Sequence, residues 1–307
     1  MTSYKYFLLF FVFFICCEKS NYLTNTGQYN LSLCNDTELI TERISVLSFN
    51  RLNGTSIHSV SQVIDLLQPD IIGLQESYDA GIELADRFNY CFYGDNTSSV
   101  AILSKYPFEV INDSQFKIIM NDDLFINFFN IHLPAYPYQP YDIRDTLITT
   151  ELQAIHQAEQ TRGTQVNELI NLVDNINNQM PIVIVGDFNE PSHLDWVIGA
   201  ANPMQFQFNN QLLPFTVDWP TSKKMLDAGF SDAYRVLFNN PIDYPGYTWT
   251  TNYSINEVHD RIDFIYYNEG LILDSLFLVG PDDVSSIIVP GYESDHRALF
   301  SIFTLPF

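Results

Sequence analysis

Basic residues are scarce in this chain of 307 residues, in which 14 lysines and arginines stand against 37 aspartates and glutamates and the formal net charge is −23. Proteins that bind duplex nucleic acid nonspecifically gain affinity by neutralising several phosphates with lysine and arginine. The sequence has no basic run with interleaved aromatics, so it offers no dedicated nucleic-acid-binding patch. Acidic nucleases stay open, because divalent cations bound at carboxylates invert the local field.

Apolar runs long enough to span a bilayer are also missing. The segment from Tyr4 to Cys17 has one early lysine and an apolar run, followed by charged residues, which is too short for a membrane span and typical of a secretion signal. We therefore expect residues 1–17 to be a signal peptide, residues 18–43 an N-terminal extension, and the mature protein to be secreted or held in the cell envelope. Cys17 is also a candidate lipid acceptor of the bacterial lipoprotein type, with ordinary signal cleavage as the alternative.

Cysteine is rare, and beyond the signal only Cys34 and Cys91 remain. Export is compatible with a disulfide between them, and two unlinked buried thiols are the alternative. The chain shows no internal repeat or linker, and 46% of its residues are hydrophobic, so residues 44–307 are expected to form one domain.

Apolar periodicity divides this region into two halves in which strands alternate with helices. Amphipathic helices are predicted near Ile57–Leu67 and over roughly Leu147–Asn177. The predicted strands are Ile44–Asn50, Asp70–Gln75, Val100–Ser104, Phe125–Leu133, Ile182–Val185, Arg261–Tyr267, Leu276–Val279 and Arg297–Phe303. The pattern indicates an α/β fold with two sheets covered by helices.

Two strings of residues carry candidate chemistry at strand ends. In VIVGDFNEPS, a β-branched run is expected to stop at Gly186, so that Asp187 and Asn189 emerge at its end. In ESDHRALF, Asp295 and His296 directly precede an alternating strand. The first string alone is also compatible with an ordinary strand-ending turn, because Asp and Asn bond their own backbone.

Further polar residues accompany these strings at apolar strands: Asn50 ends SVLSFN, Glu76 follows DIIGLQ, His132 ends FFNIH, and Asp260 and Asp263 lie in HDRIDFIYY. From about residue 44 to residue 303, this ordered set resembles the endonuclease/exonuclease/phosphatase superfamily, which includes deoxyribonuclease I, abasic-site endonucleases, neutral sphingomyelinases and inositol polyphosphate phosphatases. The resemblance implies a four-layer α/β/β/α sandwich of the deoxyribonuclease I type, with the site in the cleft above the two sheets.

The resemblance also implies a divalent metal. A phosphoester hydrolase needs a cation to polarise a phosphoryl oxygen, and Mg²⁺ prefers oxygen ligands, with Mn²⁺ as a substitute. Glu76 occupies the metal-ligand position of the superfamily. Asn50 is expected to help position metal or phosphate, and Asp295 to contribute a second contact.

The remaining motif residues correspond to catalytic positions of the superfamily. Asp187 and Asn189 would orient the attacking water and the phosphate. His296 would be the terminal catalytic histidine, held by Asp263, and the residues leave open whether it takes a proton or stabilises charge. His132 resembles the histidine that deoxyribonuclease and sphingomyelinase branches use at the leaving oxygen, and abasic-site endonucleases differ at this position.

Two neighbouring features are expected to frame the site. Asp260 lies three residues before Asp263, and on a strand this spacing puts it on the opposite face, as a rim group or a partner of Arg261. The segment Pro134–Tyr141 is too rich in proline for a regular element and should project beside the site. Its tyrosines are compatible either with stacking on a substrate or with closing a loop over the core.

For several other residues the sequence leaves more than one interpretation open. Arg144 and Arg162 are candidate contacts of the phosphate or of the residues that surround it, or else helix-surface residues. Trp249 is a candidate site wall or part of the core. The aromatics of Phe206–Trp219 would touch a membrane in a lipid-cleaving enzyme, and packing inside an insertion is the alternative.

These observations predict an exported, Mg²⁺-dependent phosphodiesterase that attacks phosphorus with activated water. Its phosphoester substrate would be a nucleic acid, for an extracellular nuclease, or a phospholipid, for a sphingomyelinase-like enzyme. A noncatalytic binding protein on the same fold is the competing class, and it would be expected to lack some of the acidic or imidazole groups that are all present here. The oligomeric state is left open.

Overall fold

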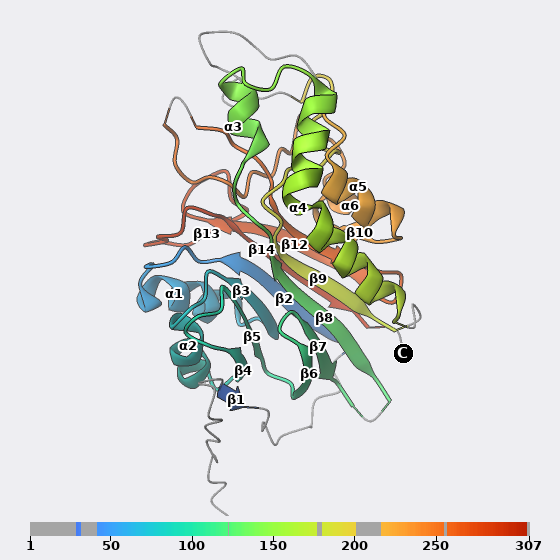
Figure 1. Ribbon diagram of the computed structural model, residues 1–307. Helices are drawn as coiled ribbons and strands as arrows, with labels where there is room; N and C mark the ends of the chain where they lie inside the picture. Colours follow the sequence, from blue (N-terminus) through green and yellow to red (C-terminus); the bar gives the residue numbers. More distant parts are fainter. Residues whose placement is uncertain are drawn as a thin grey trace, which may run out of the picture.

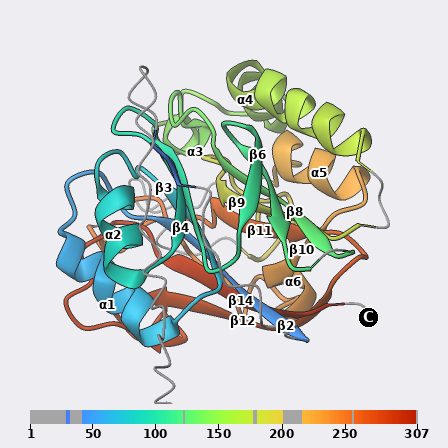
Figure 2. The ribbon, with the colours of Figure 1, turned by 90° about the horizontal axis from the view of Figure 1, so that it is seen from below.

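The computed structural model describes residues 29–31, 42–121, 123–176, 180–200, 216–254 and 257–305. Two β-sheets pack face to face and helices cover the outer face of each, which gives four α/β/β/α layers (Figures 1 and 2). The predicted fold class is therefore confirmed. The predicted signal peptide with Cys17 and the thiol of Cys34 lie outside the described residues, and Cys91 is disulfide-bonded.

The first sheet contains eight strands in the order β1-β4-β5-β3-β2-β14-β12-β13. Their bounds are β1 Tyr29–Leu31, β2 Arg43–Asn50, β3 Ile71–Gln75, β4 Cys91–Gly94, β5 Val100–Ser104, β12 Ile272–Gly280, β13 Ile287–Ile288 and β14 Ala298–Thr304. Strands β2 and β3 run parallel, and helix α1, Ile57–Leu67, connects them. Strand β1 comes from the predicted N-terminal extension and pairs with β4 at the edge of the sheet.

The second sheet contains six strands in the order β10-β11-β9-β8-β7-β6. Their bounds are β6 Phe108–Asn112, β7 Gln115–Ile119, β8 Phe125–His132, β9 Ile182–Asp187, β10 Ser231–Asp232 and β11 Asp263–Tyr267. Strands β8 and β9 run parallel, and β11 runs antiparallel to β9. The crossover between β8 and β9 contains the short helix α3, Gln139–Arg144, and the long helix α4, Glu151–Asp174.

The helices divide between the two outer faces, as Figure 1 shows. Helix α1 and helix α2, Ala80–Phe88, bury Val60, Ile64 and Leu84 against the first sheet. Helix α4 and helix α5, Pro220–Asp227, bury Val166 and Met225 against the second sheet. Helix α6, Ala233–Leu237, follows β10. Among the described residues, no helix is both long and apolar enough to cross a membrane.

The core between the sheets explains why the strands pair face to face. Both contributing faces are almost wholly apolar, and burial of this surface is the main favourable term in folding. The fully buried side chains include Val46, Ile71, Ile102, Phe128, Val185 and Leu299. Asn130 is a polar exception in β8: its amide nitrogen donates to the carbonyls of Leu74 and Ala101 in the first sheet, at 2.9 Å each. This side chain ties the two sheets together next to the strand ends.

Strand β9 continues further than the sequence predicts. Gly186 was expected to end it, but the strand includes Gly186 and ends at Asp187. Gly186 has φ of +150°, and a Cβ at this position would lie 2.1 Å from the carbonyl oxygen of Ile131 in β8. Glycine is thus required for close approach of the two strands rather than for a turn.

Other predicted bounds shift by a few residues. The long helix begins at Glu151, because the hydroxyl of Thr150 accepts a hydrogen bond from the backbone N–H of Gln153 and caps it. The segment Pro134–Tyr141 is not free of regular structure as predicted, since α3 begins at Gln139 with proline in its first turn, where the missing N–H costs nothing.

Candidate active site

The pairing of strands brings the motif residues of the second sheet together. In the parallel pair β8 and β9, His132 lies opposite Asp187. In the antiparallel pair β9 and β11, Asp187 lies opposite Asp263. The three side chains therefore come from adjacent strands at one end of the sheet. Asn50 ends β2 at the corresponding end of the first sheet, and Glu76 follows β3 beside it.

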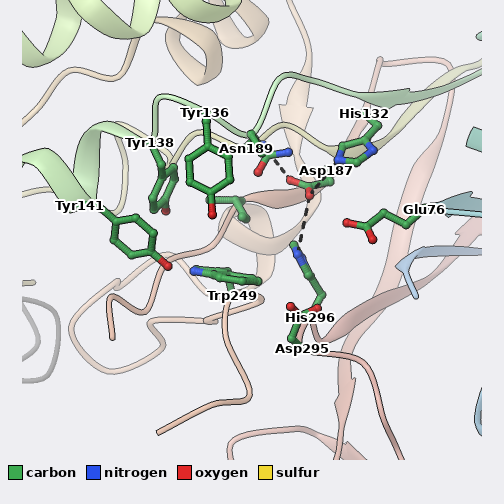
Figure 3. Close-up of a pocket in the computed structure, with 12 residues that line it drawn as sticks. Glu76, His132, Tyr136, Tyr138, Tyr141, Asp187, Asn189, Trp249, Asp295 and His296 are labelled. Atoms are coloured by element: carbon green, nitrogen blue, oxygen red, sulfur yellow. Dashed lines mark hydrogen bonds and ion pairs between the residues drawn. The ribbon is translucent and has the colours of Figure 1, made fainter. Parts of the chain in front are cut away.

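Asp187 is the centre of the resulting hydrogen-bond network (Figure 3). Its Oδ1 accepts from the backbone N–H of Asn189 at 2.8 Å, and its Oδ2 accepts from Nδ2 of Asn50 at 3.0 Å. The Nε2 atoms of His132 and His296 lie 3.6 and 3.8 Å from the same Oδ2. Asp187 is 1% exposed, so this carboxylate interacts with its partners largely without water.

Burial sets the protonation behaviour of Asp187. Burial raises the pKa of its carboxyl group, and the charge of Asp263 acts in the same direction, while His296 and His132 oppose both effects. A base takes up protons most effectively when its pKa lies near the working pH. The environment therefore makes Asp187 a better proton acceptor than an exposed aspartate.

His296 is held by a carboxylate on the opposite side of its ring. Its Nδ1 lies 2.8 Å from Oδ2 of Asp263, which leaves Nε2 to face Asp187 and Asn50. Burial alone would lower the pKa of His296, but the adjacent charges of Asp263 and Asp187 outweigh it and raise the pKa to about 10. The imidazole is therefore cationic at neutral pH, which suits stabilisation of developing negative charge.

Neighbouring hydroxyl groups fix the positions of this pair. The hydroxyl of Ser294 donates to the carbonyl of Asn50 and accepts from the backbone N–H of His296, which joins the end of β2 to the segment before β14. The hydroxyl of Thr248 accepts from the backbone N–H of Asp263 at 3.0 Å. Both hydroxyls are buried, so these contacts hold the pair without competition from water.

Glu76 and Asp295 place two further carboxylates in the same pocket. Glu76 has a left-handed backbone, with φ of +52°, and its Oε2 accepts from the backbone N–H of Asn53 at 2.7 Å. Burial raises the pKa of Asp295, and the charge of Glu76 adds to this effect while His296 opposes it. Oδ1 of Asp295 is buried and has no hydrogen-bond partner within the described part of the chain.

This donor set fits a hard divalent cation, because Glu76 and Asp295 supply carboxylate oxygens and one oxygen of Asp295 lacks a partner within the described residues. Asn50 turns its amide nitrogen toward Glu76, at 3.4 Å, whereas its amide oxygen accepts from the backbone N–H of Leu52. A second group, Asp187, Asp263 and His296, also has potential ligand atoms within 4.8 Å of one another. The hydrogen bond between Asp263 and His296 already occupies one oxygen and one ring nitrogen of that group. Glu76 with Asp295 is therefore the better candidate for Mg²⁺.

The pocket has a cavity of about 200 Å³. Its lining includes six of the eight residues that the sequence predicts for the site: Glu76, His132, Asp187, Asn189, Asp295 and His296. The other two, Asn50 and Asp263, lie behind them and are hydrogen-bonded to Asp187 and His296. The structure thus brings all eight residues together, and their individual roles are proposals.

Four aromatic side chains also line the pocket, beside Ala135 and Ile262: Tyr136, Tyr138, Tyr141 and Trp249. Trp249 forms a wall of the site, which is one of the two interpretations that the sequence left open. Its ring centroid lies 4.9 Å from that of His296. Both interpretations of the tyrosines apply. Tyr136 is 71% exposed and free to stack on a substrate, whereas Tyr138 is buried and closes the loop over the core.

Asp260 is not a rim group. It is 1% exposed, and its carboxylate accepts from the hydroxyl of Tyr138 at 2.7 Å and from Nε1 of Trp196 at 2.8 Å. These partners could not be predicted from sequence, because Tyr138 and Trp196 are distant from Asp260 in the chain. Trp219 is also buried and packs against Trp196, while residues 206–215 of the predicted aromatic stretch lie outside the described residues.

Arg162 holds the backbone of Pro134–Tyr141, the tyrosine segment, rather than contacting a phosphate. It is fully buried in α4, and its guanidinium donates to the carbonyls of Pro134, Ala135 and Pro137. Nη1 also donates to Oε1 of Gln139. Arg144, in contrast, is partly exposed and pairs with the adjacent Asp145.

We expect Arg162→Lys to lower the free energy of unfolding by about 1–3 kcal/mol and to loosen the tyrosine segment, because lysine cannot supply the fork that satisfies three buried carbonyls. Denaturant unfolding measures the first effect, and the rate of chymotryptic cleavage after Tyr138 or Tyr141 measures the second, because the bond after Tyr136 is protected by Pro137. Arg144→Lys is the matched control at the surface and should change both by much less. Equal effects of the two substitutions would contradict the supporting role of Arg162.

Comparison with known proteins matches residues 27–296 to the Endonuclease/Exonuclease/phosphatase family. Uncharacterized protein F14F9.5 from Caenorhabditis elegans is 28% identical over 295 residues, which covers 85% of this chain and 91% of that protein. An AP endonuclease from Archaeoglobus fulgidus superposes with a TM-score of 0.58 at 18% identity, covering 85% of this chain and 100% of that one. TDP2 from C. elegans gives a TM-score of 0.51 at 19% identity, covering 85% and 75%. At these identities the solved structures show a shared fold alone.

Proposed function

This chain belongs to the endonuclease/exonuclease/phosphatase family, whose members are phosphoester hydrolases, and from this premise we propose that it is a Mg²⁺-dependent phosphodiesterase that attacks phosphorus with water activated by Asp187. One observation is the main support for this proposal. The Oδ2 atom of Asp187 lies within 4 Å of Nε2 of both His132 and His296, inside a pocket that also contains two further carboxylates. A base, two imidazoles and a hard-cation site are therefore present together.

The geometry supports a separate role in hydrolysis for each of these residues. Water attacks phosphorus and its proton passes to Oδ2 of Asp187, while Asn189 and Asn50 orient that carboxylate. The bond between phosphorus and the leaving oxygen breaks, and His132 hydrogen-bonds or protonates that oxygen. The cationic imidazole of His296 stabilises the charge that develops on the phosphoryl oxygens.

Glu76 and Asp295 would hold the metal ion, and Asn50 lies beside Glu76. A bound divalent cation would polarise a phosphoryl oxygen and offset charge in the transition state. Because the backbone N–H of Asn53 donates to Glu76, this carboxylate is positioned before substrate enters. The complete set of acidic and imidazole groups argues against a noncatalytic binding protein.

We also propose that the protein is exported, on the strength of the apolar segment that ends at Cys17. A nuclease and a lipid phosphodiesterase are both compatible with the site chemistry. The net charge of −23 disfavours a long polyanionic substrate, because the field of the whole protein repels it.

Hydrolysis that EDTA abolishes and Mg²⁺ or Mn²⁺ restores is the expected result for the protein lacking its signal segment. The assay should compare duplex DNA, RNA, sphingomyelin vesicles and bis(p-nitrophenyl) phosphate, with the Asp187→Asn variant run in parallel to identify contaminating activity. In the same assay, Glu76→Gln should shift the Mg²⁺ titration to higher concentration, because it removes a charged ligand. EDTA-insensitive turnover would contradict the metal dependence, and an unchanged Mg²⁺ titration would remove Glu76 from the ligand set.

A further inference from the structure

The pocket has two chemically different ends. Figure 3 shows carboxylates and imidazoles gathered at one end and the side chains of Tyr136, Tyr138, Tyr141 and Trp249 gathered at the other. No lysine or arginine occurs among the residues that line the pocket in the described part of the chain. The aromatic end therefore presents π faces without a fixed positive charge of its own.

Carboxylates behind the aromatic end make its rings richer in electrons. The hydroxyl of Tyr141 donates to Oε1 of Glu257 at 2.6 Å, and the hydroxyl of Tyr138 donates to Oδ2 of Asp260 at 2.7 Å. Tyr141 is also hydrogen-bonded to the side chain of Trp249, which links the rings into one cluster. A cation over the face of such a ring is attracted by its quadrupole and by the carboxylate beyond it.

Two nearby arginines do not cancel this attraction. The guanidinium of Arg144 lies 4.5 Å from the ring centroid of Tyr141, but it forms two hydrogen bonds with the carboxylate of Asp145, at 2.8 and 3.0 Å. Arg162 is fully buried and lies 3.7 Å from the carboxylate of Glu190. Each guanidinium charge is thus balanced by an adjacent carboxylate. The net charge of −23 adds a long-range attraction for cations.

On these grounds, and resting on the proposed phosphodiesterase function, we propose that the aromatic end binds a quaternary ammonium group carried by the phosphodiester substrate, as in a phosphocholine ester. The cavity of about 200 Å³ suits a compact head group, since sites for larger ligands usually measure roughly 300–1,000 Å³. The cation would lie between Tyr136 and Trp249, and the phosphoryl group would reach Asp187. The site would then prefer a positively charged head group over an uncharged one of the same shape.

A pair of soluble substrates tests this selection. Both are p-nitrophenyl phosphodiesters, one carrying choline and the other the 3,3-dimethylbutyl group, which has the same shape without the charge. We expect kcat/KM for the choline ester to be higher by about tenfold or more, since cation–π contacts at partly desolvated sites reach that size. Equal kcat/KM values, or a preference for the p-nitrophenyl ester of thymidine phosphate over the choline ester, would overturn the proposal.

Substitutions at Tyr136 assign the preference to the aromatic end. Tyr136→Leu should bring the ratio of the two kcat/KM values close to one, whereas Tyr136→Phe should retain most of it because the π face survives. Tyr244 is 51% exposed and does not line the pocket, so Tyr244→Leu is the matched control and should leave the ratio unchanged. A ratio that is unaffected by Tyr136→Leu would overturn the assignment.

Binding can be measured separately from turnover. Trp196 and Trp219 are buried together and do not line the pocket, so a fluorescence change on adding phosphocholine should come mainly from Trp249 and be largely lost in Trp249→Phe. Phosphocholine should bind at least about tenfold more tightly than 3,3-dimethylbutyl phosphate. Binding without hydrolysis of any ester would defeat the phosphodiesterase proposal alone, and equal binding of the two ligands would defeat the cation site alone. Competition by phosphatidylcholine vesicles as well as by phosphocholine would identify a lipid as the source of the head group.

Discussion

Asp187→Asn is expected to lower kcat by about 10²–10⁴-fold while leaving the fold and the metal titration nearly unchanged. Asparagine has almost the same shape and can still accept the backbone N–H of residue 189, so the turn after β9 should persist. An amide, however, cannot take a proton from water at neutral pH. It also removes the negative charge that both imidazoles face at 3.6 and 3.8 Å. Steady-state kinetics on the best substrate of the panel measure this loss.

Asp174→Asn provides the matched control, because Asp174 is an exposed residue at the end of α4 and does not line the active-site pocket. Its kcat should equal that of the unmodified protein. Thermal unfolding of both variants separates a lost base from a lost fold. If the Asp187→Asn protein is folded and retains near-normal kcat in an uncontaminated preparation, Asp187 is not the base.

The strand-end residues of the site could be predicted from the sequence because they follow from local pattern and sheet register. An apolar run that ends in a polar residue indicates a buried strand with a side chain at its edge, and parallel neighbours bring such edges together. His132 and Asp187 satisfy this rule, as they lie opposite each other in β8 and β9. Glu76 satisfies it in the first sheet. That these particular strand ends meet was implied by the resemblance to the superfamily, and the register of the strands brings them together.

Partners that depend on loop geometry were not predictable in the same way. Tyr138 and Asp260 are separated by 122 positions, and their hydrogen bond depends on the path of the segment after β8. The sequence left Arg162 open as a contact of the phosphate, a contact of the residues around it, or a surface residue, because a single arginine in a polar helix gives no signal that it is buried. Its three carbonyl partners are backbone atoms, which carry no sequence information. The aromatic end of the pocket therefore had to come from the structure.

The hairpin of β6 and β7 shows a further limit for the fold. Each strand has five residues and only two or three of them face the core, so alternation over such a short length is a weak signal. In β6, Phe108 is buried while Glu109 and Ile111 are exposed, which breaks the simple rule that apolar residues face inward. The hairpin forms because Phe116 and Ile118 complete the core between the sheets.

The pair of His296 and Asp263 gives the site a pH dependence whose sign can be stated. The folded-state pKa of His296, about 10, lies above its ordinary value of 6.5 because the charges of Asp263 and Asp187 outweigh burial. A raised folded pKa stabilises the protein fully below about pH 6.5, and this stabilisation is lost as pH rises through about 10. If cationic His296 stabilises charge in the transition state, activity should also fall as pH rises through about 10 and the imidazole loses its proton.

Asp263→Asn should therefore lower the pKa of His296 and move the alkaline loss of activity toward neutral pH, together with a fall in kcat of about 10²–10⁴-fold. The change removes the carboxylate that lies 2.8 Å from Nδ1 and leaves burial, which favours the neutral imidazole, less opposed. Nitrogen-15 NMR titration of the metal-free protein measures this pKa, and His296→Gln assigns the signal among the six histidines. Asp274→Asn, at a carboxylate that pairs with Arg43 near the start of β12, is the control and should leave the titration unchanged. A neutral His296 at pH 7 in the unmodified protein, or a pKa that does not respond to Asp263→Asn, would show that the carboxylate only orients the ring.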